Sequence, residues 1–366
     1  MRIELKQVLF PQQKSKIKAG EGKTEGKYRF FTSSPIQSKF VDEANYDKPS
    51  LIFGTGGNAS VHYCDEPFST STDCLVMYGR SKTELETIYN YLKSNIGILE
   101  NGFKGAGLKH ISKDYILAIE IDLPSEAIQL EFLQKNRIVD ELIEAKQTQL
   151  RLNEDLVKSR FIEMFGDPIT NEKNWSMYPL ESVCKTIVDC PHSTPNYTTE
   201  DTGYMCIRTS IVKKNRILWD EIEYISHEEY IQRIQRKRPE KGDVVYTREG
   251  AILGIAAMID RDCNVALGQR SMLLSPNTDK CLPQFLSVAM NFESFLKKAL
   301  GGVSGSASPH INVGDIKTFT IILPPIELQK QFTAFIEQID KSKFEIQQSL
   351  EKLEILKKSL MQQYFG

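Results

Sequence analysis

The sequence predicts an α+β protein in which two pseudo-symmetric globular domains are separated by two long helices that form an antiparallel coiled coil. Three observations predict this fold. The second half of the chain repeats the first, two long segments have helical composition and spacing, and short apolar runs bounded by turn residues fill the rest. The chain has 366 residues, a length that suits two domains or more.

The repeat is clearest at an offset of 200 residues. IDLP at 121–124 matches IILP at 321–324, and His110 and His310 each follow small residues and precede an isoleucine. The earlier parts match at an offset of about 175 residues, so the second domain is expected to carry roughly 25 more residues than the first. Five segments follow from this repeat: a first domain at 1–124, a helix at 125–166, a linker at 167–174, a second domain at 175–324 and a helix at 325–366.

The two long segments have the signals of helix ends and of a coiled-coil seam. Pro124 and Pro324 lie at the starts, where a fixed φ is tolerated, and Gly166 and Gly366 follow the last turns. Apolar residues recur at spacings of three and four, with polar interruptions at Asn136, Lys146, Asn153 and Lys343. The expected seam comprises Phe132, Val139, Ile143, Leu150, Val157 and Met164 on the first helix, and Phe332, Ile336, Ile339, Ile346, Leu350, Leu353 and Leu360 on the second. Each helix would be about 60 Å long.

The globular segments are expected to be rich in strands. Short β-like runs lie between Gly, Asn, Asp and Ser turns, while two segments have helical spacing. The expected strands are 50–54, 73–79, 243–247, 254–259 and 319–323, and the expected helices are 86–95 and 284–300.

Composition excludes several classes of protein. The net charge of −2 excludes a chain coated evenly in positive charge, so a nucleic-acid surface would be a local patch. No apolar run reaches about 18 residues, so no transmembrane helix is expected. Seven cysteines without a C-x-x-C pair indicate reduced thiols and a cytoplasmic location.

No pattern supports catalysis by this chain. The glycine turn FGTGGN at 53–58 resembles a nucleotide or S-adenosylmethionine cradle, but a β-like stretch follows it where such a cradle needs a helix. Cys184, Cys190 and His192 lack a fourth zinc ligand at the usual spacing. His110 and His310 are equally open to a structural hydrogen bond and to a polar surface role. No metal site and no cofactor of its own are expected.

Polar loops in both domains suggest a surface for DNA. Lys and Arg suit phosphate oxygens, while Ser, Thr, Asn, Gln and Arg can also read base edges. A solvated charged face is the alternative for any single run, but two such surfaces on duplicated domains favour DNA. Two globular domains of different sequence, separated by the paired long helices, predict a DNA target in two parts with different sequences. The candidates are Thr32, Ser33, Thr55, Asn58, Ser69, Thr70 and Lys104 in the first domain, and Arg208, Thr209, Ser210, Lys213, Arg248, Gln269, Arg270 and Ser304 in the second.

The whole chain resembles the specificity subunit of type I restriction–modification enzymes. The resemblance rests on this architecture and on the combination and order of local patterns. These patterns are KGDVVYTREGAILG (241–254), ALGQRSMLL (266–274), HINVGDIKTFTIILPPIELQKQF (310–332) and its echo LPSEAIQLEF (123–132), with weaker matches at 53–63 and 69–78.

The resemblance implies that each globular domain is a target recognition domain reading half of a bipartite double-stranded DNA sequence. The helices would set the spacing and dock two modification (methyltransferase) subunits, with restriction subunits joining the full assembly. S-adenosylmethionine, Mg and ATP would then belong to those partners. Apolar positions outside the seam could supply the docking face, or could simply broaden the seam: Leu142, Leu152, Phe161, Ile355 and Leu356. The alternatives are a two-headed adaptor that binds no DNA, and a stand-alone DNA methyltransferase or nuclease.

Overall fold

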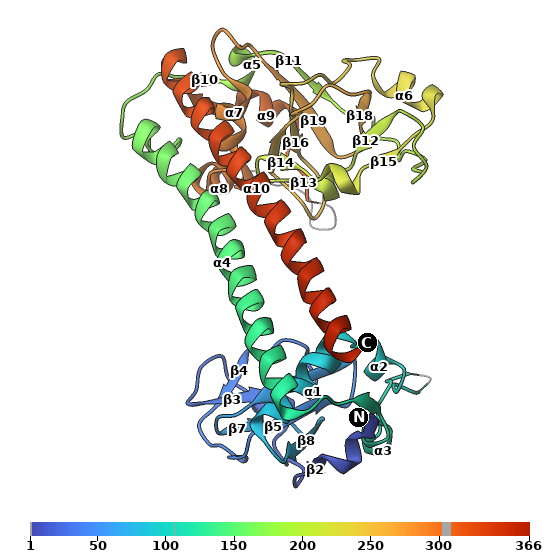
Figure 1. Cartoon of the computed structure of the whole chain (residues 1–366). Coiled ribbons are helices and arrows are strands. Elements are labelled where there is room, and N and C mark those ends of the chain that lie inside the picture. Colours follow the sequence, from blue (N-terminus) through green and yellow to red (C-terminus); the bar gives the residue numbers. More distant parts are fainter. Residues whose placement is uncertain (1, 106, 302–308) are drawn as a thin grey trace. The chain divides into compact units, whose positions relative to one another are not determined.

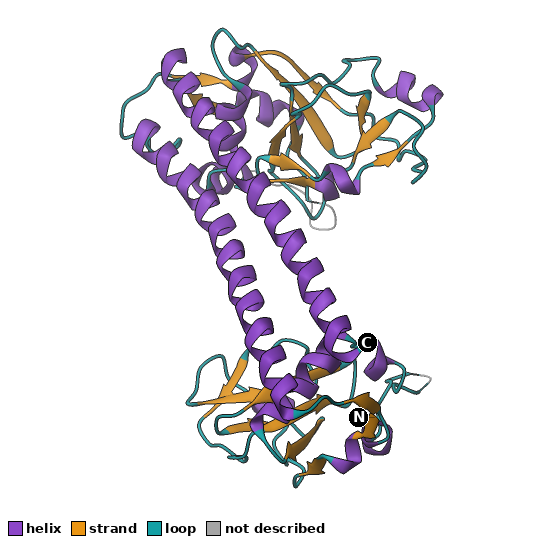
Figure 2. Ribbon diagram, viewed as in Figure 1, coloured by secondary structure: helices purple, strands orange, loops and turns teal. Residues whose placement is uncertain are grey.

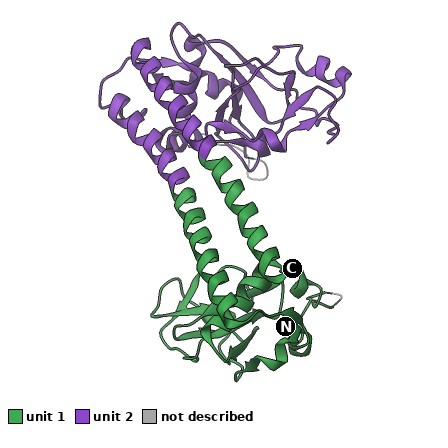
Figure 3. Ribbon diagram, viewed as in Figure 1, with its two compact units in different colours: residues 1–148, 346–366 green, residues 149–345 purple. Residues whose placement is uncertain are grey.

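The computed structural model describes residues 2–105, 107–301 and 309–366 of the chain. These residues form two compact units, residues 1–148 with 346–366 and residues 149–345 (Figure 3). Both boundaries fall inside long helices, so each unit contains a globular part and a part of each long helix. The predicted segments separate the globular domains from the helices, whereas the compact units divide each long helix between them.

Unit 1 contains a four-stranded sheet of order β2-β8-β5-β6, a three-stranded sheet of order β4-β3-β7 and the pair β1-β9. Within the three-stranded sheet, β3 pairs antiparallel with β4 and parallel with β7. The strands are β1 Arg2–Glu4, β2 Leu9–Pro11, β3 Tyr28–Phe31, β4 Lys39–Val41, β5 Ser50–Gly54, β6 Ser60–Cys64, β7 Phe68–Thr70, β8 Cys74–Gly79 and β9 Glu120–Asp122. The helices are α1 Lys82–Ser94, α2 Gly97–Glu100 and α3 Lys113–Leu117, with 3-10 turns η1 Leu5–Gln7 and η2 Ala19–Glu21.

Unit 2 contains a four-stranded sheet of order β11-β19-β16-β17, a three-stranded sheet of order β15-β12-β18 and the pair β10-β20 (Figure 1). The strands are β10 Met177–Pro179, β11 Cys184–Asp189, β12 Met205–Ile207, β13 Val212–Lys213, β14 Arg216–Ile217, β15 Glu223–Tyr224, β16 Val244–Thr247, β17 Ala256–Met258, β18 Val265–Leu267, β19 Ser271–Pro276 and β20 Thr320–Ile322. The helices are α5 Leu180–Val183, α6 His227–Arg233, α7 Pro283–Met290, α8 Glu293–Leu300 and α9 Val313–Thr318, with 3-10 turns η3 Thr209–Ile211 and η4 Trp219–Glu221.

The two units share one topology, which confirms the predicted duplication. β12 pairs antiparallel with β15 and parallel with β18, as β3 does with β4 and β7. The hairpin β13-β14 and the helix α6 are extra in unit 2. They lie between β12 and β16, so the additional residues of the second half extend the region around its smaller sheet.

Helices cover the larger sheets because their apolar faces match. In unit 1, Leu85, Ile88 and Leu92 of α1 are buried in one core with Leu51 and Met77 of the sheet. In unit 2 the predicted helix at 284–300 is two helices, α7 and α8. The break falls at Asn291, whose side-chain amide donates to Ala256 O at 2.7 Å and so ties the turn to the sheet.

The long helices α4 (Glu126–Phe165) and α10 (Ile326–Phe365) are each 40 residues long, close to the predicted bounds (Figure 2). In unit 1, Phe132 of α4 packs against Phe365 of α10, and Asp140 is paired with Lys357. As residue numbers rise on one helix they fall on the other, so the helices run antiparallel. Asn136 interrupts the seam as predicted; it is buried and donates to Asp140 Oδ2 at 3.1 Å.

The unit 2 halves of the same helices are also antiparallel. Phe161 and Phe165 pack against Phe332, and the Arg160 guanidinium lies over the Phe335 ring. The predicted seam positions are buried or half-buried on both helices. Gly166 ends α4 with φ +75 and donates to Ile162 O at 2.8 Å, as expected for a glycine after the last turn.

Candidate nucleic-acid interface

One edge of unit 1 brings together three loops that are distant in sequence. Ser71 N donates to Phe31 O at 2.8 Å, which joins the β7–β8 turn to the end of β3. Thr55 N donates to Asp73 O at 2.9 Å, which joins the β5–β6 turn to the same place. Ile111 N donates to Thr55 O at 3.2 Å and adds the segment that carries His110. Backbone hydrogen bonds thus define this edge, leaving the side chains to vary.

Unit 2 builds the equivalent edge with the same backbone bonds. Gly268 N donates to Ile207 O at 2.9 Å, Arg248 N to Arg270 O at 3.0 Å and Ile311 N to Arg248 O at 2.8 Å. Arg248 therefore takes the place of Thr55, and Arg270 the place of Asp73. The two edges have one scaffold and different chemistry.

The unit 1 edge presents hydroxyls, an amide and one lysine. Ser33 Oγ and Thr55 Oγ1 both donate to Asp73 O, at 2.8 and 2.9 Å. These two hydroxyls are half-buried and keep acceptor capacity only, since their protons are used internally. Asn58 and Lys104 are exposed. The structure thus brings these four predicted residues, with Thr32, to neighbouring loops.

Ser69 and Thr70 are corrections to the predicted set. Both side chains are fully buried in β7. Ser69 Oγ donates to Glu43 O at 2.8 Å and accepts from Asn45 N at 2.9 Å, so its polar atoms serve a turn inside the unit. Neither side chain is accessible at the surface in this position.

The glycine turn at 53–58 is a strand connection, as predicted. Gly57 has φ +81, and the strand β6 follows, with no helix to cradle a phosphate. His110 Nδ1 lies 3.1 Å from Thr55 O, so this histidine also ties the turn to its neighbours. Its repeat partner His310 forms a backbone bridge with Glu249 at the corresponding place in unit 2.

The unit 2 edge carries more cationic side chains. Arg208 Nε lies 2.7 Å from Glu223 Oε2 and its guanidinium lies over the Tyr197 ring, yet 40% of the side chain is exposed. Lys213 Nζ donates to Ser210 O at 2.7 Å, which holds the lysine beside the loop after β12. Ser210 is exposed, and Thr209, which lies between Arg208 and Ser210, is half-buried.

Arg248 is a second correction, because its side chain points into the unit. Nε and Nη2 donate to the two carboxylate oxygens of Asp189, at 2.8 and 3.2 Å. His192 Nε2 lies 3.0 Å from the same carboxylate, and Arg236 Nη1 donates to Asp189 O at 3.1 Å. Arg248 thus fixes the backbone at the edge instead of offering a free guanidinium to a base.

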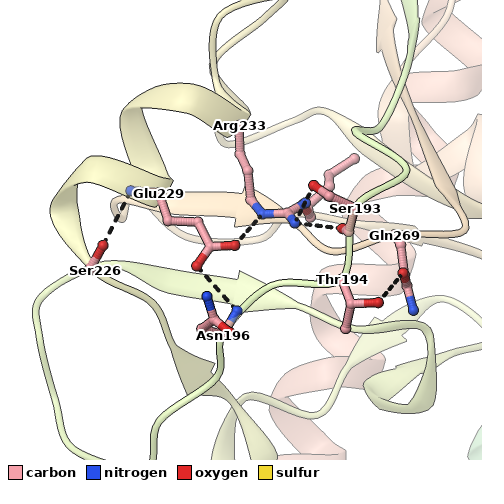
Figure 4. A network of polar contacts seen from close by, with 8 residues as sticks. Ser193, Thr194, Asn196, Ser226, Glu229, Arg233 and Gln269 are labelled. Atoms are coloured by element: carbon pink, nitrogen blue, oxygen red, sulfur yellow. Dashed lines mark hydrogen bonds and ion pairs between the residues drawn. The ribbon is translucent and has the colours of Figure 1, made fainter.

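Arg233 is a residue that sequence reasoning missed as part of the site. It is buried, and its guanidinium donates to Ser193 O at 2.6 Å and Leu267 O at 3.2 Å, with Glu229 as its ionic partner (Figure 4). Figure 4 also shows Thr194 donating to Gln269 Oε1, at 2.8 Å. One arginine therefore holds the loop after β11 against the end of β18. Arg233 begins the basic run RIQRKRPEK (233–241), whose composition suggested an exposed charged surface.

Gln269 and Arg270 lie on the turn between β18 and β19. Gln269 is half-buried, and Arg270 is exposed with φ +73. Among described non-glycine residues with positive φ, the other three are asparagines, which tolerate that region well. Arg270 is therefore held in a costly conformation at the edge. Ser304, the last predicted residue, lies outside the described residues.

Four of the five proposed docking side chains are exposed on the long helices. In unit 1, Leu142, Ile355 and Leu356 are 45%, 66% and 46% exposed, and in unit 2 Leu152 is 60% exposed. Phe161 is a correction. It is fully buried against Phe165, Phe285, Phe292 and Phe332, because at this end of α4 both α10 and the globular part cover this side of the helix.

The described residues contain no group of three or more His, Cys, Asp or Glu side chains that could share a metal ion. Cys184 and Cys190 are buried free thiols. None of the described helices combines the length and the apolar character needed to cross a bilayer.

A duplicated α+β unit with a polar edge, joined to antiparallel long helices, is the architecture of a protein with two recognition domains. The family described as "Type I restriction modification DNA specificity domain" matches residues 2–152 and 172–357. The chain belongs to this family and carries its domain twice.

Individual relatives agree with this assignment. The chain is similar to the type I restriction enzyme MjaVIII specificity subunit of Methanocaldococcus jannaschii, with 22% identity over 362 residues, 92% of this chain and 85% of the relative. It is similar to the EcoBI specificity subunit of Escherichia coli, with 20% identity over 347 residues, 86% and 72% of the two chains. The crystal structure of the S subunit from M. genitalium shares the fold, with TM-score 0.64, 15% identity and coverage of 100% and 96%.

Proposed function

We propose that this specificity subunit reads an asymmetric, bipartite double-stranded DNA target, one half with each polar edge. The observation that carries the proposal is the pair of equivalent edges with one backbone scaffold and different side chains. Thr55 and Asp73 in unit 1 stand where unit 2 has Arg248 and Arg270. Because base recognition depends on side-chain donors and acceptors, edges that differ in this way would select different half-sites.

The residues proposed to face DNA are the accessible ones. Lys104, Arg208, Lys213 and Arg270 offer positive charge to phosphates or to guanine, while Asn58 and Gln269 offer amides to bases. Thr32, Ser33, Thr55, Thr209 and Ser210 add hydroxyls. Arg248 and Arg233 act in the proposal through the loops they hold. Target recognition domains would span 1–124 and 175–324, with 167–174 as the linker.

The helices at 125–166 and 325–366 would set the distance between half-sites and bind modification subunits. Exposed Leu142, Leu152, Ile355 and Leu356 support the docking role, since apolar side chains outside a seam gain from burial against a partner. In this proposal the chain is non-catalytic. Two methyltransferase subunits, and restriction subunits where present, would bring S-adenosylmethionine, Mg and ATP, and the assembly would act on DNA in the cytoplasm.

The decisive experiment is mapping of N6-methyladenine across the host genome with and without this gene. Loss of methylation at one split, asymmetric motif is the expected result. An unchanged pattern would contradict the proposal and favour the two-headed adaptor. Binding of the purified chain to DNA carrying that motif should weaken steeply with salt, because phosphate contacts release counterions. Methylation by the purified chain with S-adenosylmethionine alone would instead indicate a stand-alone enzyme.

A further inference from the structure

Two glutamines occupy equivalent places in the first turns of the long helices. Gln129 Nε2 donates to Pro124 O at 2.8 Å, and Gln329 Nε2 donates to Pro324 O at 2.8 Å. Both side chains are buried, Gln129 with 5% exposure and Gln329 with none. The sequence repeat therefore places one carboxamide at the base of each globular part.

In unit 2 the chain itself binds this carboxamide. Gln329 Oε1 accepts from Leu282 N at 2.9 Å, and Gln329 Nε2 also donates to Lys280 O at 2.9 Å. The loop that carries these groups, residues 277–282, connects β19 to α7 and begins where Asn277 N donates to Val183 O at 2.8 Å. A carboxamide that pairs with a C=O and with the N–H two residues later recognises a main chain, whatever its side chains.

In unit 1 the corresponding loop is missing. Only Arg80 and Ser81 connect β8 to α1. Gln129 Oε1 consequently accepts no hydrogen bond from any described residue. A cavity of about 660 Å³ opens there, lined by Gln129, Arg80 and Glu84 among others.

Two features of this cavity favour a ligand that is partly polar and partly apolar. Glu84 lines it, and its Oε1 is buried without a hydrogen-bond partner. Ile3, Val8 and Leu123 give it an apolar wall. An unpaired buried acceptor costs on the order of 1–3 kcal/mol. The Glu84 oxygen, with the Gln129 carboxamide and the apolar wall beside it, therefore favours an occupant with N–H groups and apolar atoms.

We propose that the unit 1 cavity binds an extended polypeptide segment of a modification subunit, whose main chain pairs with the Gln129 carboxamide as residues 280–282 pair with Gln329. The proposal deepens the docking role proposed above and rests on it. The occupant is identified by chemistry: one C=O and one N–H two residues apart, with a donor toward Glu84. Because unit 2 fills its own site, only one of two docked subunits gains this contact.

The test uses the full chain and the purified modification subunit encoded with it, titrated by calorimetry. Gln129→Met keeps the side-chain volume and removes the donor and acceptor. The tighter binding event should weaken about tenfold, the effect of losing about 1.4 kcal/mol. The matched control is Gln329→Met, which should lower the unfolding temperature and leave binding unchanged. Equal weakening by both variants, or none by Gln129→Met, would overturn the proposal.

A second variant removes the dependence on one side chain. Inserting the sequence of residues 277–281 between Arg80 and Ser81 keeps Ser81 as the N-cap of α1. This insertion should fill the cavity with the chain's own loop, raise the unfolding temperature and block the tighter event. Unaltered binding by this folded graft would overturn the inference while the docking role stands. If the wild-type chain fails to bind the modification subunit at all, the proposed docking function fails and the inference with it.

Discussion

Arg248 donates two hydrogen bonds to Asp189, from Nε and Nη2 to the two carboxylate oxygens, and only 7% of the Arg248 side chain is exposed. This pair ties the end of β16 to the end of β11, while the Arg248 main chain bonds to both Arg270 and Ile311. The arginine therefore sets the position of the unit 2 edge from beneath it.

Arg248→Ala should reduce affinity for one half-site and stability together. The change leaves Asp189 poorly paired, and removing one partner of a buried pair costs about 3 kcal/mol or more. Binding of the variant to DNA in which only the unit 2 half-site is mutated measures the effect on affinity. Urea unfolding measures the effect on stability. The double variant Arg248→Ala with Asp189→Ala should recover part of the stability because no unpaired charge remains. Equal loss at both half-sites would contradict the placement.

Phe161→Ala should destabilise the chain by about 3–5 kcal/mol, because it opens a cavity among four aromatic rings. Leu152→Ala, on the same helix but 60% exposed, is the matched control and should change stability by less than about 0.5 kcal/mol. Urea unfolding measures both. A small effect of Phe161→Ala would mean that the ring is not part of the core.

Thiol reactivity should follow burial. Burial raises the pKa of Cys74 to about 11 and those of Cys184 and Cys206 to about 12, so these thiols stay protonated at pH 8. Cys263, half-buried, should react first with Ellman's reagent, and the other six only on unfolding. Rapid reaction of more than one thiol in the folded chain would contradict this.

The same thiols predict a loss of stability at high pH. Below the unfolded pKa of 9 the thiols are protonated in both states, so stability is unaffected. As the pH rises from 9 toward 11 and 12, the unfolded chain loses these protons first, and ionisation favours unfolding. Unfolding temperatures measured between pH 8 and 11 should fall, and Cys206→Ala should reduce the slope.

The long helices could be predicted because their apolar spacing holds over 40 residues, and local sequence decides it. The failure at Phe161 has a tertiary cause. Phe161 was not assigned to the seam, so periodicity suggested exposure, but its ring packs against Phe332 of α10 and against Phe285 and Phe292 of the globular part. The spacing of apolar residues alone does not show whether a globular domain covers the side of a helix outside the seam or leaves it exposed.

The residues of the candidate edges were predicted from their polar side chains, and in the structure some of them are accessible while others are buried. Ser69 and Thr70 are polar residues on a buried strand, where Ser69 bonds to the turn at Glu43 and Asn45. Arg233 looked like part of a charged surface, but it bonds to the main-chain oxygens of Ser193 in the loop after β11 and of Leu267 at the end of β18. Composition gives the inventory of donors and acceptors, whereas their partners depend on contacts between distant segments.

Arg270 offers the sharpest separation of recognition from stability. Its φ of +73 is strained for an arginine and natural for glycine, so Arg270→Gly should raise stability by up to about 1 kcal/mol. The same change removes an exposed guanidinium and should weaken binding at the unit 2 half-site. If the guanidinium contacts a phosphate, the slope of log affinity against log salt should fall by about one, whereas Arg270→Lys should keep that slope. If it reads a guanine, both variants should lose discrimination at one base, since lysine lacks the two-point fork. Unchanged affinity of Arg270→Gly across half-site variants would remove Arg270 from the interface and leave its strain as a feature of the turn alone.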